Sequence, residues 1–117
     1  MSETDLQSAI MKALKQAGYW AFRVNSGGRQ GRVRLAPDGT PDICVVSPHG
    51  WLEVKQPGKP LRPAQSDWHA QAQRLGVRVA VVTSVGEAVS VAGDWTRQDN
   101  LRDGLAMELK RLAEGML

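Results

Sequence analysis

Residues 39–58, GTPDICVVSPHGWLEVKQPG, contain two short apolar runs separated by a turn-like sequence. The runs are 43–46 and 51–54, and both are rich in the β-branched and aromatic residues that favour strands. The intervening residues, 47–50, include a proline and a glycine, which are typical of turns. This pattern predicts a β-hairpin with charged residues near its open end.

Three of those charged residues, Asp42, Glu53 and Lys55, are candidates for a common site. Side chains alternate between the two faces of a strand, so Glu53 and Lys55 project from the same face. A four-residue loop at 47–50 would pair Asp42 with Lys55. All three side chains would then share that face, with Asp42 diagonal to Glu53. A two-residue turn at 49–50 would move Asp42 one pair further away, so the turn decides whether Asp42 joins the cluster.

The other face of the hairpin is apolar and is the predicted core. It carries Ile43, Val45, Leu52 and Val54. The two carboxylates on the polar face match the oxygen ligands that Mg²⁺ and Mn²⁺ prefer. The backbone carbonyl of Val54, between the two functional side chains, is a further candidate ligand. A cation there would suit chemistry on a phosphate ester, with Lys55 neutralising the charge that develops on the phosphate oxygens.

Helix-like and strand-like patterns lie on both sides of the hairpin. The expected helices are 3–17 and 63–75, and the expected strands are 19–24 and 77–82. A helix of crossover length joins 51–54 to the last strand, so we predict that these two strands are parallel. The apolar sequence of 77–82 predicts burial on both faces. Residues 84–87 resemble a capping box that opens a short helix, and a separate last helix begins near Asp99 or Asn100.

The composition is that of one globular domain. The chain has 117 residues, of which 42% are hydrophobic and 23% are charged. We expect residues 1–95 to form the domain and 96–117 to add a C-terminal helix for packing or dimerisation. No apolar run has the length needed to cross a membrane, and the charged N-terminal residues do not predict a secretion signal. The single cysteine, Cys44, excludes an internal disulfide and a thiolate zinc cluster, so a reducing cytoplasm is expected.

Basic residues alternate with glycines in 25–39, NSGGRQGRVRLAPDG, and the net charge of the chain is +3. Glycine lets a backbone approach a phosphate, and arginine binds phosphate through two hydrogen bonds. We therefore predict nucleic-acid contacts from this loop and from polar residues that flank the charged cluster. The predicted contact residues are Arg23, Asn25, Ser26, Arg29, Arg32, Arg34, Lys59 and Arg62.

Pro41-Asp42 followed by Glu53-Val54-Lys55 resembles the motif of the PD-(D/E)xK nuclease superfamily, and the surrounding sequence resembles its VRR-NUC branch. The matching segments follow one another in the same order as in that branch, over about residues 3–90. They consist of Glu3 with Leu6-Gln7, 22–27 (FRVNSG), 39–42 (GTPD), 63–65 (PAQ), and the strand 77–82 before Ser84-Val85.

The resemblance implies an α/β fold of the three-layer, restriction-endonuclease-like type, with core order α-β-β-β-α-β and a mixed sheet flanked by helices. It implies Mg²⁺- or Mn²⁺-dependent hydrolysis of DNA phosphodiesters, without an organic cofactor. Asp42 and Glu53 would be metal ligands, and Lys55 would be the catalytic lysine. Glu3 would reach the site from the first helix, and Gln65 would line it from the helix after the hairpin.

Stand-alone members of this branch, from phages and bacteria, resemble Holliday-junction resolvases and act as homodimers on branched DNA. We therefore expect a structure-specific endonuclease in a bacterial or phage-infected cell. The alternatives are a monomeric flap or nicking nuclease and a non-catalytic DNA-binding module of the same fold.

His69 is expected on a helix surface. An apolar stripe in the last helix is expected to pack on the protein's own core or, alternatively, on a second subunit. The stripe consists of Leu101, Leu105, Leu109, Leu112 and Met116.

Overall fold

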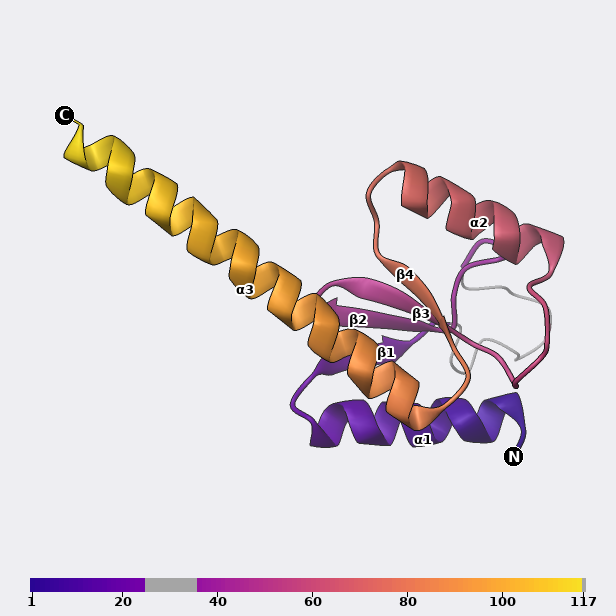
Figure 1. Cartoon of the computed structure of the whole chain (residues 1–117). Helices are drawn as coiled ribbons and strands as arrows, with labels where there is room; N and C mark the ends of the chain where they lie inside the picture. The colour runs from indigo at the N-terminus through magenta and orange to yellow at the C-terminus, as the bar shows by residue number, and fades with distance from the viewer. Residues whose placement is uncertain (25–35, 117) are drawn as a thin grey trace.

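A four-stranded mixed sheet lies at the centre of the protein, with helices on both of its faces (Figure 1). The structure, a computed structural model, describes residues 1–24 and 36–116. Its elements are α1 (Glu3–Gln16), β1 (Trp20–Arg23), β2 (Ile43–Ser47), β3 (Gly50–Val54), α2 (Pro63–Arg74), β4 (Val79–Val82) and α3 (Val85–Gly115). The order α-β-β-β-α-β, followed by α3, confirms the predicted fold class.

The strands follow the order β1-β2-β3-β4 across the sheet. β1 and β2 are antiparallel, as are β2 and β3, whereas β3 and β4 are parallel. The parallel pair was predicted from the crossover helix between these strands, and it is confirmed. The crossover is α2, which begins at Pro63, a residue suited to the first helical turn.

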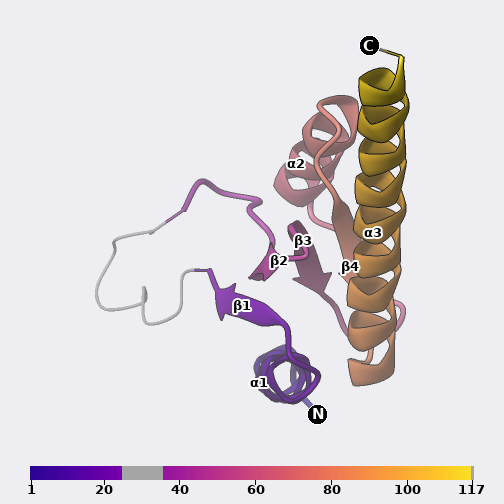
Figure 2. The ribbon, with the colours of Figure 1, turned by 90° about the vertical axis from the view of Figure 1, so that its left-hand side faces the viewer.

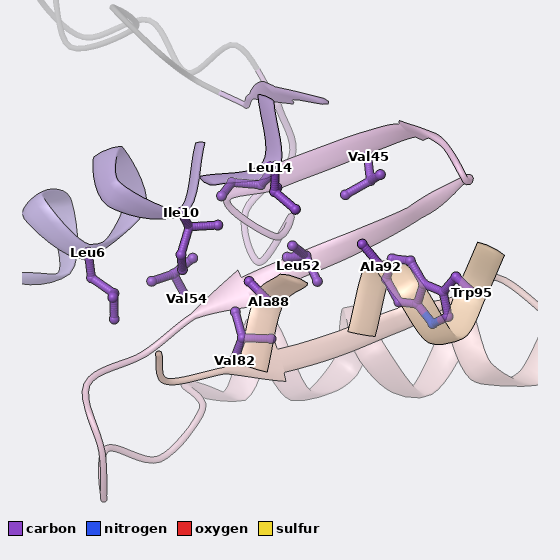
Figure 3. Packing of buried hydrophobic residues seen from close by; sticks show 11 residues of the cluster. Leu6, Ile10, Leu14, Val45, Leu52, Val54, Val82, Ala88, Ala92 and Trp95 are labelled. Atoms are coloured by element: carbon purple, nitrogen blue, oxygen red, sulfur yellow. The ribbon is translucent and has the colours of Figure 1, made fainter. Parts of the chain in front are cut away.

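One face of the sheet forms the apolar core with α1 and α3. Figure 3 shows side chains from both helices directed toward those of the central strands. The cluster includes Leu6, Ile10 and Leu14 of α1, the predicted hairpin residues Ile43, Val45, Leu52 and Val54, Val82 of β4, and Ala88, Ala92 and Trp95 of α3. The predicted apolar face of the hairpin is therefore confirmed. The opposite face of β3 carries Trp51 and Glu53, and it is covered by α2, whose Trp68 packs edge-on against Trp51.

β4 is buried on one face only, so the prediction of burial on both faces was wrong. Val82 is fully buried in the core, whereas Val81 is 41% exposed. β4 is an edge strand, and Val81 faces the α2 side of the sheet, next to Glu53 of β3. The helix does not cover this end of the strand.

α3 is one continuous helix of 31 residues, where the sequence predicted two shorter helices. Its start was predicted correctly, since Oγ of Ser84 accepts a hydrogen bond from the backbone N–H of Glu87 at 3.1 Å. Asp99 does not cap a second helix. Instead its two carboxylate oxygens accept hydrogen bonds from the guanidinium of Arg78 at 3.0 and 3.1 Å. The C-terminal half of α3 extends away from the sheet, as the view in Figure 2 also shows.

Among the described residues, no helix combines the length and apolar character needed to cross a membrane.

Candidate active site

Asp42 lies immediately before β2 and is hydrogen-bonded to segments on both sides of that strand. Its carbonyl oxygen accepts a hydrogen bond from the backbone N–H of Val24 at 2.8 Å. Its Oδ2 accepts a hydrogen bond from the backbone N–H of Val54, also at 2.8 Å. The carboxylate therefore stands where a backbone acceptor would pair with β3, and this contact fixes it beside Glu53.

The hairpin register differs from the predicted one by two residues, because Cys44 lies opposite Trp51 and not opposite Glu53. The observed pairs are Ile43 with Leu52, Cys44 with Trp51 and Val45 with Gly50. The loop between the last pair has the predicted four residues but spans 46–49 instead of 47–50. Continued by one residue, this register puts Asp42 opposite Glu53 and not opposite Lys55. Asp42 still shares a face with Glu53, as predicted. It lies directly opposite Glu53, and therefore closer to it than the predicted diagonal arrangement would allow.

The shift is explained by Gly50, which is a strand residue and not part of the turn. A Cβ at this position would lie 2.3 Å from the indole ring of Trp95 in α3. The absence of a side chain lets β3 and α3 approach closely. Because this contact joins residues 45 positions apart in sequence, the local turn pattern could not reveal it.

Glu53 is an almost fully buried acid, with 1% of its surface exposed. Burial raises the pKa of Glu53 to about 9, and the hydrogen bond and charge of Asp42 contribute to the rise. The Lys55 ammonium group opposes this pKa shift, and the Glu3 carboxylate adds to it. Glu53 therefore binds a proton at neutral pH, where an isolated glutamate is ionised.

Lys55 and Glu3 reach this region from different elements. Lys55 follows β3, is 8% exposed, and donates its backbone N–H to the carbonyl of Val82 at 3.0 Å. Glu3 is the first residue of α1, and its Oε1 is buried without a hydrogen-bond partner among the described residues. The side-chain amide of Gln56 donates to the carbonyl of Met1 at 2.8 Å. This contact holds the start of α1 against the end of β3.

α2 contributes Gln65 and His69, which lie one turn apart on the same helix face and are both buried. Oε1 of Gln65 accepts a hydrogen bond from the backbone N–H of Arg62 at 2.8 Å, so this side chain caps the start of the helix. Nε2 of His69 lies 3.8 Å from Oε1 of Glu53. Both atoms are buried without a hydrogen-bond partner in the part of the chain that the structure describes.

The prediction that His69 lies on a helix surface was wrong. The sequence places Ala64, Trp68, Ala72 and Leu75 on one apolar stripe and so predicts a buried Leu75, but Leu75 is 66% exposed. The buried face of α2 instead consists of Gln65, His69 and Ala72. The spacing of four between Gln65 and His69 was the available signal, because two polar residues at this spacing share a face. Burial lowers the pKa of His69, so its imidazole is neutral at pH 7.

The loop before Asp42 packs against the start of α2. Gly39 has a φ of +86°, and a Cβ added there would lie 2.2 Å from the carbonyl oxygen of Ala64. Glycine is required here for its backbone conformation and for the close approach. The contact places the segment 39–42 directly against the helix that carries His69.

The donor set fits a small divalent cation held mainly by oxygen. Asp42 and Glu53 provide two adjacent carboxylates, and Oε1 of Glu53 has no hydrogen-bond partner among the described residues. In residues 1–24 and 36–116, no group of three or more His, Cys, Asp or Glu side chains is arranged to hold a metal ion. Mg²⁺ does not require such a group, because it retains several waters and uses one or two carboxylates together with substrate phosphates. The pair therefore suits Mg²⁺ or Mn²⁺ better than zinc.

The predicted DNA contacts that the structure describes have different surroundings. Arg23 donates to Oε1 of Gln7 at 2.9 Å, so it holds β1 against α1. Arg62 is exposed and lies 3.9 Å from a carboxylate oxygen of Asp38, and Lys59 is exposed in the loop after β3. The remaining predicted contacts lie outside the described residues; they are Asn25, Ser26, Arg29, Arg32 and Arg34.

The helices and the mixed sheet define a mixed α/β fold, with Asp42 before β2, Glu53 on β3 and Lys55 directly after β3. More particularly, a solved structure described as a VRR_NUC domain has a similar fold, with a TM-score of 0.58 at 22% sequence identity. The match covers 76% of this chain and 91% of that chain. It confirms the fold expected from the VRR-NUC resemblance. No family model and no curated protein matches the chain.

Proposed function

We propose that this protein is a metal-dependent DNA endonuclease of the VRR-NUC type, which hydrolyses phosphodiester bonds. One observation carries the proposal: the buried carboxyl group of Glu53 lies beside the half-buried carboxyl group of Asp42 and close to Lys55. A buried acid beside a second acid destabilises a protein that uses it only for packing. The pair has a function if it holds a cation, which is the arrangement expected of a phosphodiesterase centre. The VRR_NUC domain fold supports the same conclusion.

Asp42 and Glu53 would hold the cation, with the backbone carbonyl of Val54 as a further candidate ligand. Mg²⁺ is the expected ion, and Mn²⁺ is the expected substitute. When bound, such an ion neutralises phosphate charge and promotes the ionisation of a water molecule. The hydrogen bond from the Val54 N–H keeps Asp42 directed toward Glu53 before any ligand arrives.

Lys55 is the group best suited to act on the reacting phosphate. It shares a face of β3 with Glu53, and its charge lowers the pKa of Glu53, so the ammonium group lies near the carboxyl pair. An ammonium in a buried position stabilises the negative charge that develops on phosphate oxygens in the transition state. It would also orient the attacking water.

The other polar residues of the site would act through these three. Glu3 adds negative charge near Glu53, from the start of α1. Gln65 fixes the start of α2 through its bond to Arg62, so its proposed contribution is positional. His69 faces Glu53, and its neutral Nε2–H would donate to the carboxylate once Glu53 is ionised.

We propose that the phosphate backbone of DNA binds Lys59 and Arg62, which are exposed, and the basic residues that the sequence predicts as contacts. We propose a structure-specific substrate, such as a four-way junction, cut by a resolvase-like homodimer in the cytoplasm of a bacterial or phage-infected cell. A monomeric flap or nicking nuclease is the alternative within the same chemistry. A non-catalytic DNA-binding module is disfavoured, because carboxylates repel phosphates unless a cation lies between them.

The test is a cleavage assay on four-way junctions, flaps and linear duplexes, with Mg²⁺, with Mn²⁺ and with EDTA. We expect metal-dependent cleavage by the wild type and none by Lys55→Ala. Lys12→Ala is the matched control, because it removes an exposed lysine of α1 that is not among the predicted DNA contacts, and it should retain catalysis. Absence of cleavage on every substrate with either metal would overturn the proposal. Cleavage of flaps but not of junctions would overturn only the resolvase-like assignment.

A further inference from the structure

The C-terminal half of α3 is exposed to solvent along its length. Every residue from 100 to 116 is exposed, and the helix accounts for the 62 Å long axis of a molecule that is 29 by 28 Å in its other dimensions (Figures 1 and 2). An isolated helix of about this length is only marginally stable in water. A surface that covers it would therefore stabilise it.

The exposed segment carries a continuous apolar stripe. Its members have the following exposed fractions: Leu101 69%, Leu105 65%, Leu109 66%, Leu112 54% and Met116 86%. The part of α3 that packs on the core uses Ala88, Ala92 and Trp95. At 100° per residue, the stripe is rotated by roughly 100° from this core-facing side. The prediction that the stripe packs on the protein's own core was therefore wrong.

The spacing of the stripe is that of a helix that pairs with another helix. Leu105, Leu109, Leu112 and Met116 follow one another at intervals of four, three and four residues. This alternation keeps the side chains on one seam of a coiled coil, where each fits between four side chains of a helix with the same repeat. A second copy of α3 has that repeat by definition.

The charges on this segment also favour a second copy over nucleic acid or a membrane surface. Residues 97–116 contain four basic side chains, Arg97, Arg102, Lys110 and Arg111, and four acidic side chains, Asp99, Asp103, Glu108 and Glu114. Ion pairs within the helix join Arg97 to Asp94, Arg102 to Asp99 and Arg111 to Glu108. Two copies therefore meet without net repulsion, whereas a polyanion would meet no net positive charge.

We propose that residues 101–116 of two copies of this chain pair as a short antiparallel coiled coil. The antiparallel arrangement follows from Arg102, which occupies the same repeat position as Leu109 and Met116. In a parallel pair, the two Arg102 side chains would face each other across the seam. In the antiparallel pair, Leu109 lies opposite Leu112 of the second copy, and the two Arg102 side chains are at opposite ends. This assignment does not depend on nuclease activity.

Sedimentation equilibrium over a range of protein concentrations tests the pairing. We expect the wild type to form a dimer, and the triple variant Leu105→Gln, Leu109→Gln, Leu112→Gln to associate about 100-fold more weakly or not at all. Glutamine favours helix, so circular dichroism should show a folded variant. Met107→Gln is the matched control, because Met107 is 73% exposed on the same helix but lies off the stripe. A monomeric wild type, or an unimpaired triple variant, would overturn the proposal.

Disulfide trapping in a Cys44→Ser background tests the orientation. Chains with Leu109→Cys should cross-link to chains with Leu112→Cys more readily than either variant cross-links to itself. If Leu109→Cys chains instead cross-link chiefly with one another, the antiparallel assignment is overturned.

Discussion

Nε2 of His69 lies 3.8 Å from Oε1 of Glu53, and both atoms are buried without a hydrogen-bond partner in the described part of the chain. The two residues come from different elements, α2 and β3, and each faces the other across the polar side of the sheet. At this separation, a small movement of either side chain would form a hydrogen bond. The relationship brings His69, which was predicted to lie on a helix surface, into the proposed metal site.

We expect His69→Leu to weaken Mn²⁺ binding by about 10-fold to 100-fold, because it removes the group that would orient the Glu53 carboxylate. His69→Gln should retain much of the affinity, since its amide nitrogen can donate in place of Nε2. Isothermal titration calorimetry with Mn²⁺ measures the effect without DNA. His49→Leu, which alters an exposed histidine, is the control. Equal Mn²⁺ affinity in wild type and His69→Leu would exclude this role.

Glu53→Gln should stabilise the protein in EDTA at neutral pH. A carboxyl whose pKa rises from 4.5 in the unfolded chain to about 9 in the folded one lowers the free energy of unfolding as pH increases between these values. The expected slope is about 1.4 kcal/mol per pH unit, and the variant should lack it. Urea unfolding at pH 5, 6, 7 and 8 measures both slopes. Parallel profiles for the two proteins would show that Glu53 carries no raised pKa.

The same substitution should abolish stabilisation by divalent cations. Mn²⁺ should raise the melting temperature of the wild type, because it binds the folded state only. It should leave the melting temperature of Glu53→Gln unchanged.

Asp42→Asn should eliminate cleavage while preserving the fold. The asparagine side-chain oxygen can still accept the hydrogen bond from the Val54 N–H, so the local structure is retained. The loss of one negative charge should leave DNA binding in EDTA unchanged or tighter. Asp67→Asn removes an exposed carboxylate from α2 and is the control. Fluorescence anisotropy and a cleavage assay provide the two measurements, and wild-type cleavage by Asp42→Asn would show that Asp42 is not a ligand.

Gly39→Ala should be much more destabilising than Gly58→Ala. Both glycines have a positive φ, +86° and +81°, so both variants incur backbone strain of about 1 kcal/mol. Only the Cβ at position 39 would collide with the Ala64 carbonyl, which should add roughly 1–3 kcal/mol. Urea unfolding compares the two. If both variants lose the same stability, the approach of this loop to α2 does not constrain the fold.

Asp99→Asn should flatten the dependence of stability on acid pH. The hydrogen bonds from Arg78 hold the pKa of Asp99 below its usual value. Such a carboxyl stabilises the folded state above its unfolded pKa, and this contribution is lost as pH falls through the folded pKa. The stability difference between wild type and variant should therefore be largest above about pH 4 and shrink below it. Asp103→Asn, on the exposed side of α3, should leave the profile unchanged.

The sequence predicted most of the fold because its patterns are local. Alternation at 43–46 and 51–54 was sufficient to assign the core face and the polar face of the hairpin. The register was not predictable, because it depends on Gly50 meeting Trp95 of α3. His69 was missed for a related reason, since the buried side of an amphipathic helix with few apolar residues is decided by what it packs against. In α3, Asp99 has the residue type of a helix cap, but its partner is Arg78 of a distant segment.

The hydrogen bond between the Val54 N–H and Asp42 has a consequence for how such sites can vary over evolutionary time. The donor is a main-chain amide, so every residue except proline at position 54 can provide it. Selection at this position can therefore act on core packing alone. The orientation of Asp42 is kept as long as the backbone of β3 keeps its position. A comparison of side chains would record position 54 as an ordinary apolar site and overlook its part in aligning the acid.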